Sequence, residues 1–526
     1  MILGKRGVMK NGPAEARPTI SLCMIVKDEE HDLPRCLRSA APWVDEIVVV
    51  DTGSRDQTVQ VAQSFGARVE HFSWSNDFAA ARNAALAYAT GDWILSLDAD
   101  EELDPATAPA LAKVVAVPIT RPRCYALLVR SLDDSKDSLA YHSGYVTRLF
   151  VNHPQVRWHR PIHEQVVLLD DPRGIDLVHC DQVTISHYGY LHAARQGRGK
   201  ATRNQDILRR AITATPNDSY LHFHLGLEHY HAHRYREAVT SFERVLELRR
   251  GKRLPAYLAP CYSLLVATHT ALGQFDQAVA SGYEGLEHFA FADLCCNLAT
   301  AHMRRQEHDQ AFDLYQRARA LHGQRHAYPT DETATTSLPL QGMGDIHLLR
   351  GDAEQASRAY AEALEFQPES ATLHKRAAQA FLLLDRPADA EQHIRKVLAL
   401  EPDDGLTVKQ LSDCLAAQSR HQEAYEFLAA RVAAATDHVG YRLLLGDLLH
   451  TLGESDAATE VLMAGVGVGD DPAHAPIYYR LSQILAELGR AEDAANAAAL
   501  AHHLDPEASA AFAVQEADAI LQQFVG

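Results

Sequence analysis

The stretch "GDWILSLDADEEL" (residues 91–103) decides the fold, because a mostly apolar run ends there in two acids. The run Trp93–Leu97 predicts a buried strand, and Asp98 and Asp100 follow it directly. Ligands of open α/β sheets bind beyond the carboxyl ends of the strands, where carboxylates suit Mg²⁺ or Mn²⁺ carrying a phosphate. For an isolated Asp-x-Asp, an acidic loop on a solvated edge is the simpler interpretation. The neighbouring segments therefore have to distinguish a ligand-binding strand end from a solvated acidic loop.

Strand-like runs alternate with helical patterns around this stretch. The pattern predicts strands at residues 19–26, 46–51, 67–72 and 93–100, and helices near 33–40, 58–65 and 78–89. Such alternation predicts a parallel sheet with right-handed crossovers. After Pro122 strand-like runs follow without obvious helices between them, at residues 124–132, 145–152 and 164–169. These runs predict a mixed or antiparallel extension of the same sheet.

From about residue 219 the sequence becomes helical and repetitive. Ala356 and Ala390 lie 34 positions apart, as do Pro368 and Pro402. These helical hairpins resemble tetratricopeptide repeats, which have this period and form solenoids that bind peptides or proteins. The pattern predicts about eight helix pairs, each with a small residue where two helices approach closely. That residue is Ala238, Ala278, Ala311, Ala356, Ala390, Ala424, Ala458 or Ala494.

One step of the repeat is longer than the others. It runs from Ala311 to Ala356 and holds "GQRHAYPTDETATTS" (residues 323–337), which we expect to be a loop. In three units an aromatic residue four positions after the alanine is expected to fill the layer between helices. These aromatic residues are Phe242, Tyr315 and Tyr360.

The composition excludes several classes of protein. A chain of 526 residues is too long for one core, so two or more domains are expected. The formal net charge of −19 opposes nonspecific binding to nucleic acid or anionic membranes. The eight cysteines lack the spacing of a disulfide framework or zinc site, which fits a reducing, cytoplasmic compartment. Without a signal-peptide core or a run of roughly 18 apolar residues, a soluble protein is expected.

The motifs of the first half occur in an informative order. Asp51 ends a predicted strand in "VVVDTGSRDQT" (residues 48–58), and the turn after it suits a nucleoside edge. Arg82 and Asn83 lie in a predicted helix that leads to the Asp98 strand, and Arg82 contacts a nucleotide, holds Asp51 or forms a structural ion pair. An acidic strand end, an Arg-Asn helix and an Asp-x-Asp strand end, in this order, resemble family 2 glycosyltransferases of the GT-A fold.

The resemblance covers residues 19–190, and the repeats extend it over most of the chain. "SLCMIVKDEEHDLPRCLRSA", "DEIVVVDTGSRDQT" and "NDFAAARNAALAYATGDWILSLDADEEL" are similar to a bacterial branch that joins this domain to tetratricopeptide repeats. This resemblance implies an α/β GT-A (Rossmann-like) domain followed by an all-α tetratricopeptide-repeat solenoid. The expected parts are a flexible N-terminus (1–17), the GT-A domain (18–190), a basic linker helix (191–218), the repeats (219–512) and a C-terminal helix or tail (513–526).

The resemblance also implies roles for individual residues. Asp51 would contact the uracil of the donor, Asp98 would lie by the ribose or the metal, and Asp100 would be the main ligand of Mn²⁺ or Mg²⁺. The donor-binding residues that it implies are Val26, Asp28, Asp51, Arg82, Asp98, Ala99, Trp158 and Arg198.

A base for the acceptor is expected in "VRWHRPIHEQV" (residues 156–166), because an inverting transfer needs a group that removes the acceptor's proton. We expect Glu164 to be this base, with His163 beside it and Trp158 stacked on a sugar face. Related enzymes often carry Gly-x-(Ile/Val)-His-Glu, and this sequence has Arg160 in place of the glycine. A surface turn with a hydrogen-bonded histidine is the non-catalytic alternative.

Further polar groups follow that segment. His187 in "ISHYGY" resembles a histidine that some GT-A enzymes add to the metal or diphosphate, and a structural role is the alternative. A basic cluster would either close over the diphosphate or form the solvated face of a linker helix; it consists of Arg195, Arg198, Lys200 and Arg203. In the histidine-rich stretch "LHFHLGLEHYHAHRY" (221–235) no acid or cysteine pattern completes a metal site, so solvated helix surface is expected.

The leading hypothesis is a metal-dependent inverting glycosyltransferase of the hexosyltransferase class. It would move a sugar from a nucleotide, UDP-linked by expectation, to a Ser, Thr or Cys side chain of a peptide or protein docked by the repeats. Surface polysaccharide or lipid-linked glycan assembly is the first alternative, and a non-catalytic repeat scaffold with a sugar-nucleotide-sensing domain is the second. Nucleotidyl transfer is the weakest hypothesis, because the Gly-rich phosphate loop of such enzymes is missing near "MIVKDEE". The sequence also leaves open whether the protein forms a homodimer.

Overall fold

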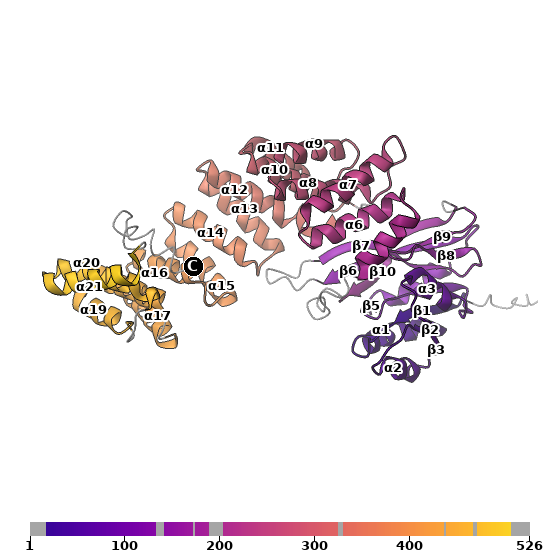
Figure 1. Cartoon of the computed structure of the whole chain (residues 1–526), viewed down its shortest axis with the longest axis horizontal. Helices are drawn as coiled ribbons and strands as arrows, with labels where there is room; N and C mark the ends of the chain where they lie inside the picture. The colour runs from indigo at the N-terminus through magenta and orange to yellow at the C-terminus, as the bar shows by residue number, and fades with distance from the viewer. Residues whose placement is uncertain are drawn as a thin grey trace, which may run out of the picture. The chain divides into compact units, whose positions relative to one another are not determined.

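The computed structural model describes residues 17–132, 141–171, 174–188, 203–324, 330–435, 438–466 and 471–506. It divides into two compact units, residues 1–339 and 340–526. The first unit holds a β-sheet domain and the first repeat helices, and the second holds later repeat helices (Figure 1). Expectations for residues 1–16, 189–202 and 507–526, Arg198 among them, lie outside the described residues.

Four parallel strands form the first part of the sheet, in the order β3-β2-β1-β4. They are β1 (Ile20–Val26), β2 (Glu46–Asp51), β3 (Arg68–His71) and β4 (Trp93–Ser96). The helices between them are α1 (Leu33–Ala40), α2 (Thr58–Ser64) and α3 (Phe78–Leu86). The predicted parallel sheet is confirmed, and its central strands are buried on both faces, as their near-continuous apolar runs require.

The sheet continues in mixed orientation as β4-β7-β6-β10-β5. The added strands are β5 (Glu101–Leu103), β6 (Arg123–Leu132), β7 (Tyr141–Val151) and β10 (Asp176–His187), and α4 (Leu111–Val115) lies between β5 and β6. β7 is antiparallel to β4 and β6, whereas β10 is parallel to β6. The predicted mixed extension is therefore confirmed for the first two runs after Pro122.

The third predicted run does not join this sheet. β9 (Gln165–Leu168) pairs with β8 (Val156–His159) as a separate two-stranded sheet. The reason is packing, because Val156, Trp158 and Val166 are buried in a cluster with the apolar face of α3. The backbone N–H of Phe78 at the start of α3 donates to the carbonyl of Pro161 (2.8 Å). The hairpin thus fixes the β8–β9 loop against α3.

From Ser219 to Leu504, the described residues form sixteen helices as eight consecutive pairs. The first unit holds α6 (Ser219–His231), α7 (Tyr235–Arg249), α8 (Leu258–Ala271), α9 (Phe275–Leu286), α10 (Ala292–Arg304) and α11 (His308–Arg319). The others are α12 (Ser337–Leu349), α13 (Ala353–Phe366), α14 (Ala371–Leu383), α15 (Pro387–Leu400), α16 (Gly405–Ala417), α17 (His421–Ala434), α18 (Val439–Thr451), α19 (Ser455–Met463), α20 (Ala475–Glu487) and α21 (Ala491–Leu504). The predicted helical hairpins are confirmed, and the recurring alanines are all buried. No helix in the described ranges has the length and apolarity to span a membrane.

The insertion in the longer step contains regular structure. β11 (Thr330–Asp331) pairs antiparallel with β7, and a 3₁₀ turn, η3 (Glu332–Thr335), follows it. The Asp331 side chain accepts from the N–H of Thr333 (2.9 Å), and its own N–H donates to Asp293 of α10 (3.1 Å). The expectation of a loop is therefore wrong for residues 330–337, because this segment adds a strand to the sheet.

Gly226 of α6 gives the ring of Phe242 on α7 the space that it occupies. A Cβ on Gly226 would lie 2.5 Å from Cε1 of Phe242, and that ring is fully buried. We expect Gly226→Ala to lower the free energy of unfolding by about 1–3 kcal/mol, because the ring has to move within a packed core. Thermal unfolding followed by circular dichroism measures the change. Adding Phe242→Leu should recover part of the loss, and an unchanged midpoint for Gly226→Ala would contradict this close approach.

Candidate active site

Nine of the predicted site residues line one cavity of about 630 Å³ in the first unit. The ends of β1, β4 and β10 supply one side of it, and the β8–β9 loop supplies another. The nine residues are Val26, Asp28, Arg82, Asp98, Ala99, Asp100, His163, Glu164 and His187. Strand ends far apart in the sequence thus converge at the edge where open α/β sheets hold their ligands.

Arg82 of α3 connects two sides of this cavity. Its Nη2 donates to Oδ1 of Asp98 at 2.6 Å, and its Nε donates to Oε1 of Glu164 at 2.5 Å. Its Nη1 donates to the hydroxyl of Ser96 at 3.1 Å. Arg82 is only 6% exposed, so water competes little for these charge-assisted bonds. Of the expected roles of Arg82, the structure therefore has an ion pair, with Asp98 and Glu164 rather than Asp51 as partners.

Arg148 of β7 is a second guanidinium at the site, and no sequence motif points to it. Its Nη2 donates to Oδ2 of Asp98 and to Oε1 of Glu101, both at 2.6 Å. Burial opposes ionisation of Asp98, but Arg148 and Arg82 outweigh it and hold the pKa of Asp98 well below its usual range. Burial raises the pKa of Glu101 although Arg148 opposes the shift. Each oxygen of Asp98 thus accepts from a different arginine.

Asp100 and His187 lie side by side on the cavity wall. The Nε2 of His187 is 3.5 Å from Oδ2 of Asp100, and its Nδ1 is 3.2 Å from the hydroxyl of Ser131. Within the described residues, no group of three or more acidic, histidine or cysteine side chains is placed to hold a metal ion. One carboxylate and one imidazole fit Mn²⁺ or Mg²⁺ if phosphate oxygens and water complete its coordination.

The β8–β9 loop has an unusual backbone. The backbone of Arg160 has φ +79° and that of His163 has φ +51°. Both values lie in the left-handed region, which residues other than glycine rarely adopt. Such residues cost on the order of 1–3 kcal/mol each and persist only where their surroundings hold them. Arg160 is held by Asp218, to which its Nε donates at 2.8 Å, and by Gln165, to which its Nη1 donates at 2.7 Å. These contacts explain how arginine can replace the motif's glycine.

His163 stacks on His224 of α6. The ring centroids are 3.6 Å apart and the planes are inclined by 11°. Burial lowers the pKa of His163 to about 4 and that of His224 well below its usual range, so both rings are neutral at pH 7. The expectation of solvated surface for the histidine-rich stretch is therefore wrong for His224, and also for His229, which is 7% exposed.

The aromatic residues of the site differ from the prediction. Trp158 is 6% exposed, packs edge-on against Phe150 with centroids 5.6 Å apart, and does not line the cavity. Its position corrects the predicted stacking on a sugar, because core packing covers the ring. Trp74 and Phe78 line the cavity instead, with centroids 4.7 Å apart. Their spacing of four along "WSNDF" is the only signal in the sequence that could have found them.

Asp51 is also held away from this cavity. It is 4% exposed, and its carboxylate accepts the backbone N–H groups of Gly53 and Ser54, both at 3.1 Å. His71 lies 3.3 Å from the same carboxylate. Thr52 lines the cavity, whereas Asp51 stabilises the turn behind it. The predicted contact with a uracil would therefore require this turn to rearrange.

The chain after the sheet domain adds Arg203 and Asn204 to the cavity wall. They begin a helical stretch over residues 203–214, and the Arg203 guanidinium lies 5.3 Å from the centroid of the Phe78 ring. Ile207, Leu208 and Ala211 of this stretch are buried against Ile162. The stretch is therefore not a solvated linker over these residues. Arg195, Arg198 and Lys200 lie outside the described residues.

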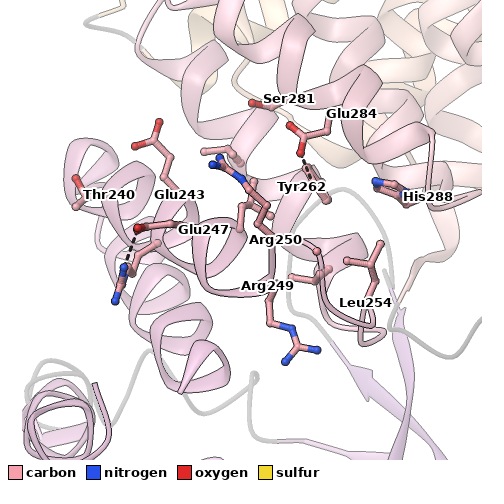
Figure 2. Close-up of a pocket in the computed structure, with 15 residues that line it drawn as sticks. Thr240, Glu243, Glu247, Arg249, Arg250, Leu254, Tyr262, Ser281, Glu284 and His288 are labelled. Atoms are coloured by element: carbon pink, nitrogen blue, oxygen red, sulfur yellow. Dashed lines mark hydrogen bonds and ion pairs between the residues drawn. The ribbon is translucent and has the colours of Figure 1, made fainter. Parts of the chain in front are cut away.

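A second cavity, of about 690 Å³, lies among α7, α8 and α9. Figure 2 shows Arg250 and Tyr262 within it, with the Tyr262 hydroxyl donating to Glu284 at 2.9 Å. Three arginines and three glutamates line this cavity, so its charge is balanced; they are Arg244, Arg249, Arg250, Glu243, Glu247 and Glu284. None of the predicted site residues that the structure describes lies there. The cavity at the strand ends is therefore the candidate active site.

Comparison with known proteins agrees with this choice. Residues 21–153 match the family model described as glycosyl transferase family 2. A TPR repeat-containing protein of Synechococcus elongatus is 40% identical over 216 residues, which are 40% of this chain and 52% of that protein. Glycosyltransferase SunS of Bacillus subtilis is 27% identical over 218 residues, which are 40% of this chain and 49% of that protein. The chain thus spans about half the length of each of these relatives.

The helical repeats have more distant likenesses. A tetratricopeptide repeat protein from Parabacteroides merdae covers 47% of this chain and 91% of its own, with 12% identity and a TM-score of 0.33. That likeness is too slight to add to the repeat pattern itself. Together, the family model and the repeat pattern give a family 2 glycosyltransferase domain of α/β fold fused to an all-α tetratricopeptide-repeat solenoid.

The Arg148 ion pairs can be tested through stability. Arg148→Met leaves the Glu101 carboxylate, 2% exposed, without its guanidinium, so we expect the free energy of unfolding to fall by about 3–5 kcal/mol. Urea unfolding followed by tryptophan fluorescence measures it, because all four tryptophans lie between residues 43 and 158. Arg121→Met, which removes a more exposed pair with Asp176, should change stability by less than about 1 kcal/mol. Equal effects of the two variants would contradict the buried network.

Proposed function

We propose that this chain is a metal-dependent, inverting glycosyltransferase that moves a sugar from a UDP-linked donor to a peptide or protein side chain. The observation that carries the proposal is the arrangement of one cavity. Asp98 and Asp100 border it at the end of β4, and Glu164 borders it from the β8–β9 loop. A donor and an acceptor would meet between these two sides. The family model over residues 21–153 supports the reaction class.

The donor side would bind the nucleotide diphosphate. Asp100 and His187 would hold Mn²⁺ or Mg²⁺, which supplies positive charge to offset the charge that develops on the leaving diphosphate. Asp98 would act mainly through Arg82 and Arg148, because both of its oxygens are already engaged by them. The pyrophosphate would also meet Arg203, which lines the same cavity.

The acceptor side would supply the base. The acceptor oxygen or sulfur forms a bond to C1 of the sugar while the bond from C1 to the diphosphate oxygen breaks. The diphosphate leaves with that electron pair, and Glu164 takes the acceptor's proton. The ion pair with Arg82 orients the Glu164 carboxylate, whose side chain is 12% exposed at the cavity. A single displacement of this kind inverts the configuration at C1.

The repeats would present the acceptor. Helical-repeat solenoids bind peptides and proteins along extended surfaces, so a Ser, Thr or Cys side chain of a docked chain is the acceptor that suits this fusion. We assign residues 18–190 to the GT-A domain and residues 219–512 to the repeats, with α6 beginning at Ser219. All eight cysteines are free and buried, which suits a reducing cytoplasm.

Metal dependence can be tested without knowing the acceptor. Slow hydrolysis of a panel of UDP-hexoses, measured as UDP release, should require Mn²⁺ or Mg²⁺ and stop in excess chelator. Asp100→Asn should keep the fold and lower this rate by at least about 100-fold, because a strong electrostatic contributor is lost. Glu102→Gln is the matched control, since Glu102 accepts from the Tyr188 hydroxyl and does not line the cavity. Full hydrolysis in chelator would overturn the metal assignment.

The base can be tested in the same assay, because water also has to lose a proton when it replaces the acceptor. Glu164→Gln should lower hydrolysis by about 10²–10⁴-fold, the usual contribution of general-base assistance. UDP binding, measured by calorimetry, should change little, because the proposed donor contacts lie on the other side of the cavity. Near-normal hydrolysis would move the role to another group. A matching loss of UDP binding would make Glu164 a structural residue.

A further inference from the structure

We propose that α6, the first helix of the repeats, is part of the active site, and that His224 on it is a positioning residue for the loop that carries His163 and Glu164. The proposal deepens the proposed function and rests on it. It assigns to one repeat helix a role other than acceptor docking. Three independent contacts between the β8–β9 loop and the start of α6 carry it.

The first contact is an ion pair at the N-terminus of α6. Asp218 is the residue that caps this helix, and its Oδ1 accepts from the backbone N–H of Tyr220 at 3.0 Å. The other oxygen of Asp218 accepts from Nε of Arg160 at 2.8 Å. The guanidinium of Arg160 also lies 4.8 Å from the centroid of the Tyr220 ring. One carboxylate therefore fixes both the start of α6 and the arginine whose φ is positive.

The second contact is the stack of His163 on His224. His163 lines the cavity next to Glu164, and His224 lies behind it on α6. Phe223 and Tyr220 meet the His224 ring edge-on, with centroids 5.2 and 4.5 Å away, so that ring has little freedom to turn. The position of His224 therefore limits where His163, and with it Glu164, can lie.

The third contact is apolar. Ile162, in the same loop, is 3% exposed and buried in a cluster with Leu221 of α6 and with Ile207 and Leu208 of the preceding helical stretch. Trp74 and Phe78, which line the cavity, pack against this cluster. The loop is thus attached to α6 at Arg160 and Ile162 as well as at His163. Such attachment matters because a misplacement of about 1 Å can cost about 100-fold in rate.

The test compares variants of the full chain in UDP-hexose hydrolysis. His224→Ala should lower kcat by about tenfold or more with little change in KM, because the donor contacts lie elsewhere. His224→Phe, which keeps a flat ring on His163, should restore kcat to within a few-fold of the parent. Asp218→Asn should lower kcat several-fold, since asparagine still caps α6 but no longer pairs with the charge of Arg160. His231→Ala is the control, because His231 is exposed at the other end of α6.

Hydrogen exchange of the loop peptide gives a readout that needs no substrate. His224→Ala should speed exchange at residues 160–166 and leave the strands β1 and β4 unchanged, whereas His231→Ala should change neither. Parental kcat and parental exchange in His224→Ala would overturn the inference. An equal loss of kcat in His224→Ala and His224→Phe would do so too, because the stack would then not matter. Parental hydrolysis by Glu164→Gln would instead overturn the proposed base, while the exchange result would still decide whether α6 holds the loop.

Discussion

The buried guanidinium of Arg82 is the interaction on which the rest of the site depends. A charge that is 6% exposed has to be fully paired, and each of its partners comes from a different element: Asp98 follows β4, and Glu164 lies between β8 and β9. The β8–β9 hairpin must therefore close over α3 for the pairing to form. The Cζ atom of Arg82 lies 5.0 Å from the centroid of the Trp158 ring, so an apolar surface packs against one face of the guanidinium. The same contacts that stabilise the hairpin set the distance between the two sides of the cavity.

The sequence predicts those parts of the fold that depend on local periodicity. The run Trp93–Leu97 and its two acids locate the strand end, and the 34-residue spacing of alanines locates the helix pairs. Arg148 escapes prediction because it reaches Asp98 only through the pairing of β7 with β4, and strand order is not written in any one segment. The role of Trp158 is predicted wrongly for a related reason, since an aromatic residue beside a predicted catalytic motif can equally be buried beneath it.

Arg160 shows how a departure from a family motif becomes a coupling between distant segments. A glycine would adopt φ +79° without cost, whereas arginine needs external support. That support comes from Asp218, 58 positions further along the chain, at the start of the first repeat helix. The substitution therefore makes the loop depend on α6. Neither sequence segment alone carries this signal, because it requires both the backbone angle and the contact across the chain.

This dependence changes how the fusion of the two kinds of structure is understood. Each unit of a helical-repeat solenoid contacts only its neighbours, so the first helix needs a cap that covers its apolar face. Here Ile162, together with the helical stretch over residues 203–214, covers Leu221 of α6. The sheet domain thus covers the first helix of the repeats, and that helix in turn holds the β8–β9 loop of the sheet domain. Since the same residues serve both purposes, separating the repeats from the sheet domain would expose apolar surface and remove the contacts of α6 with the loop that carries Glu164. The first repeat helix therefore belongs structurally to the sheet domain, although its pattern is that of a repeat.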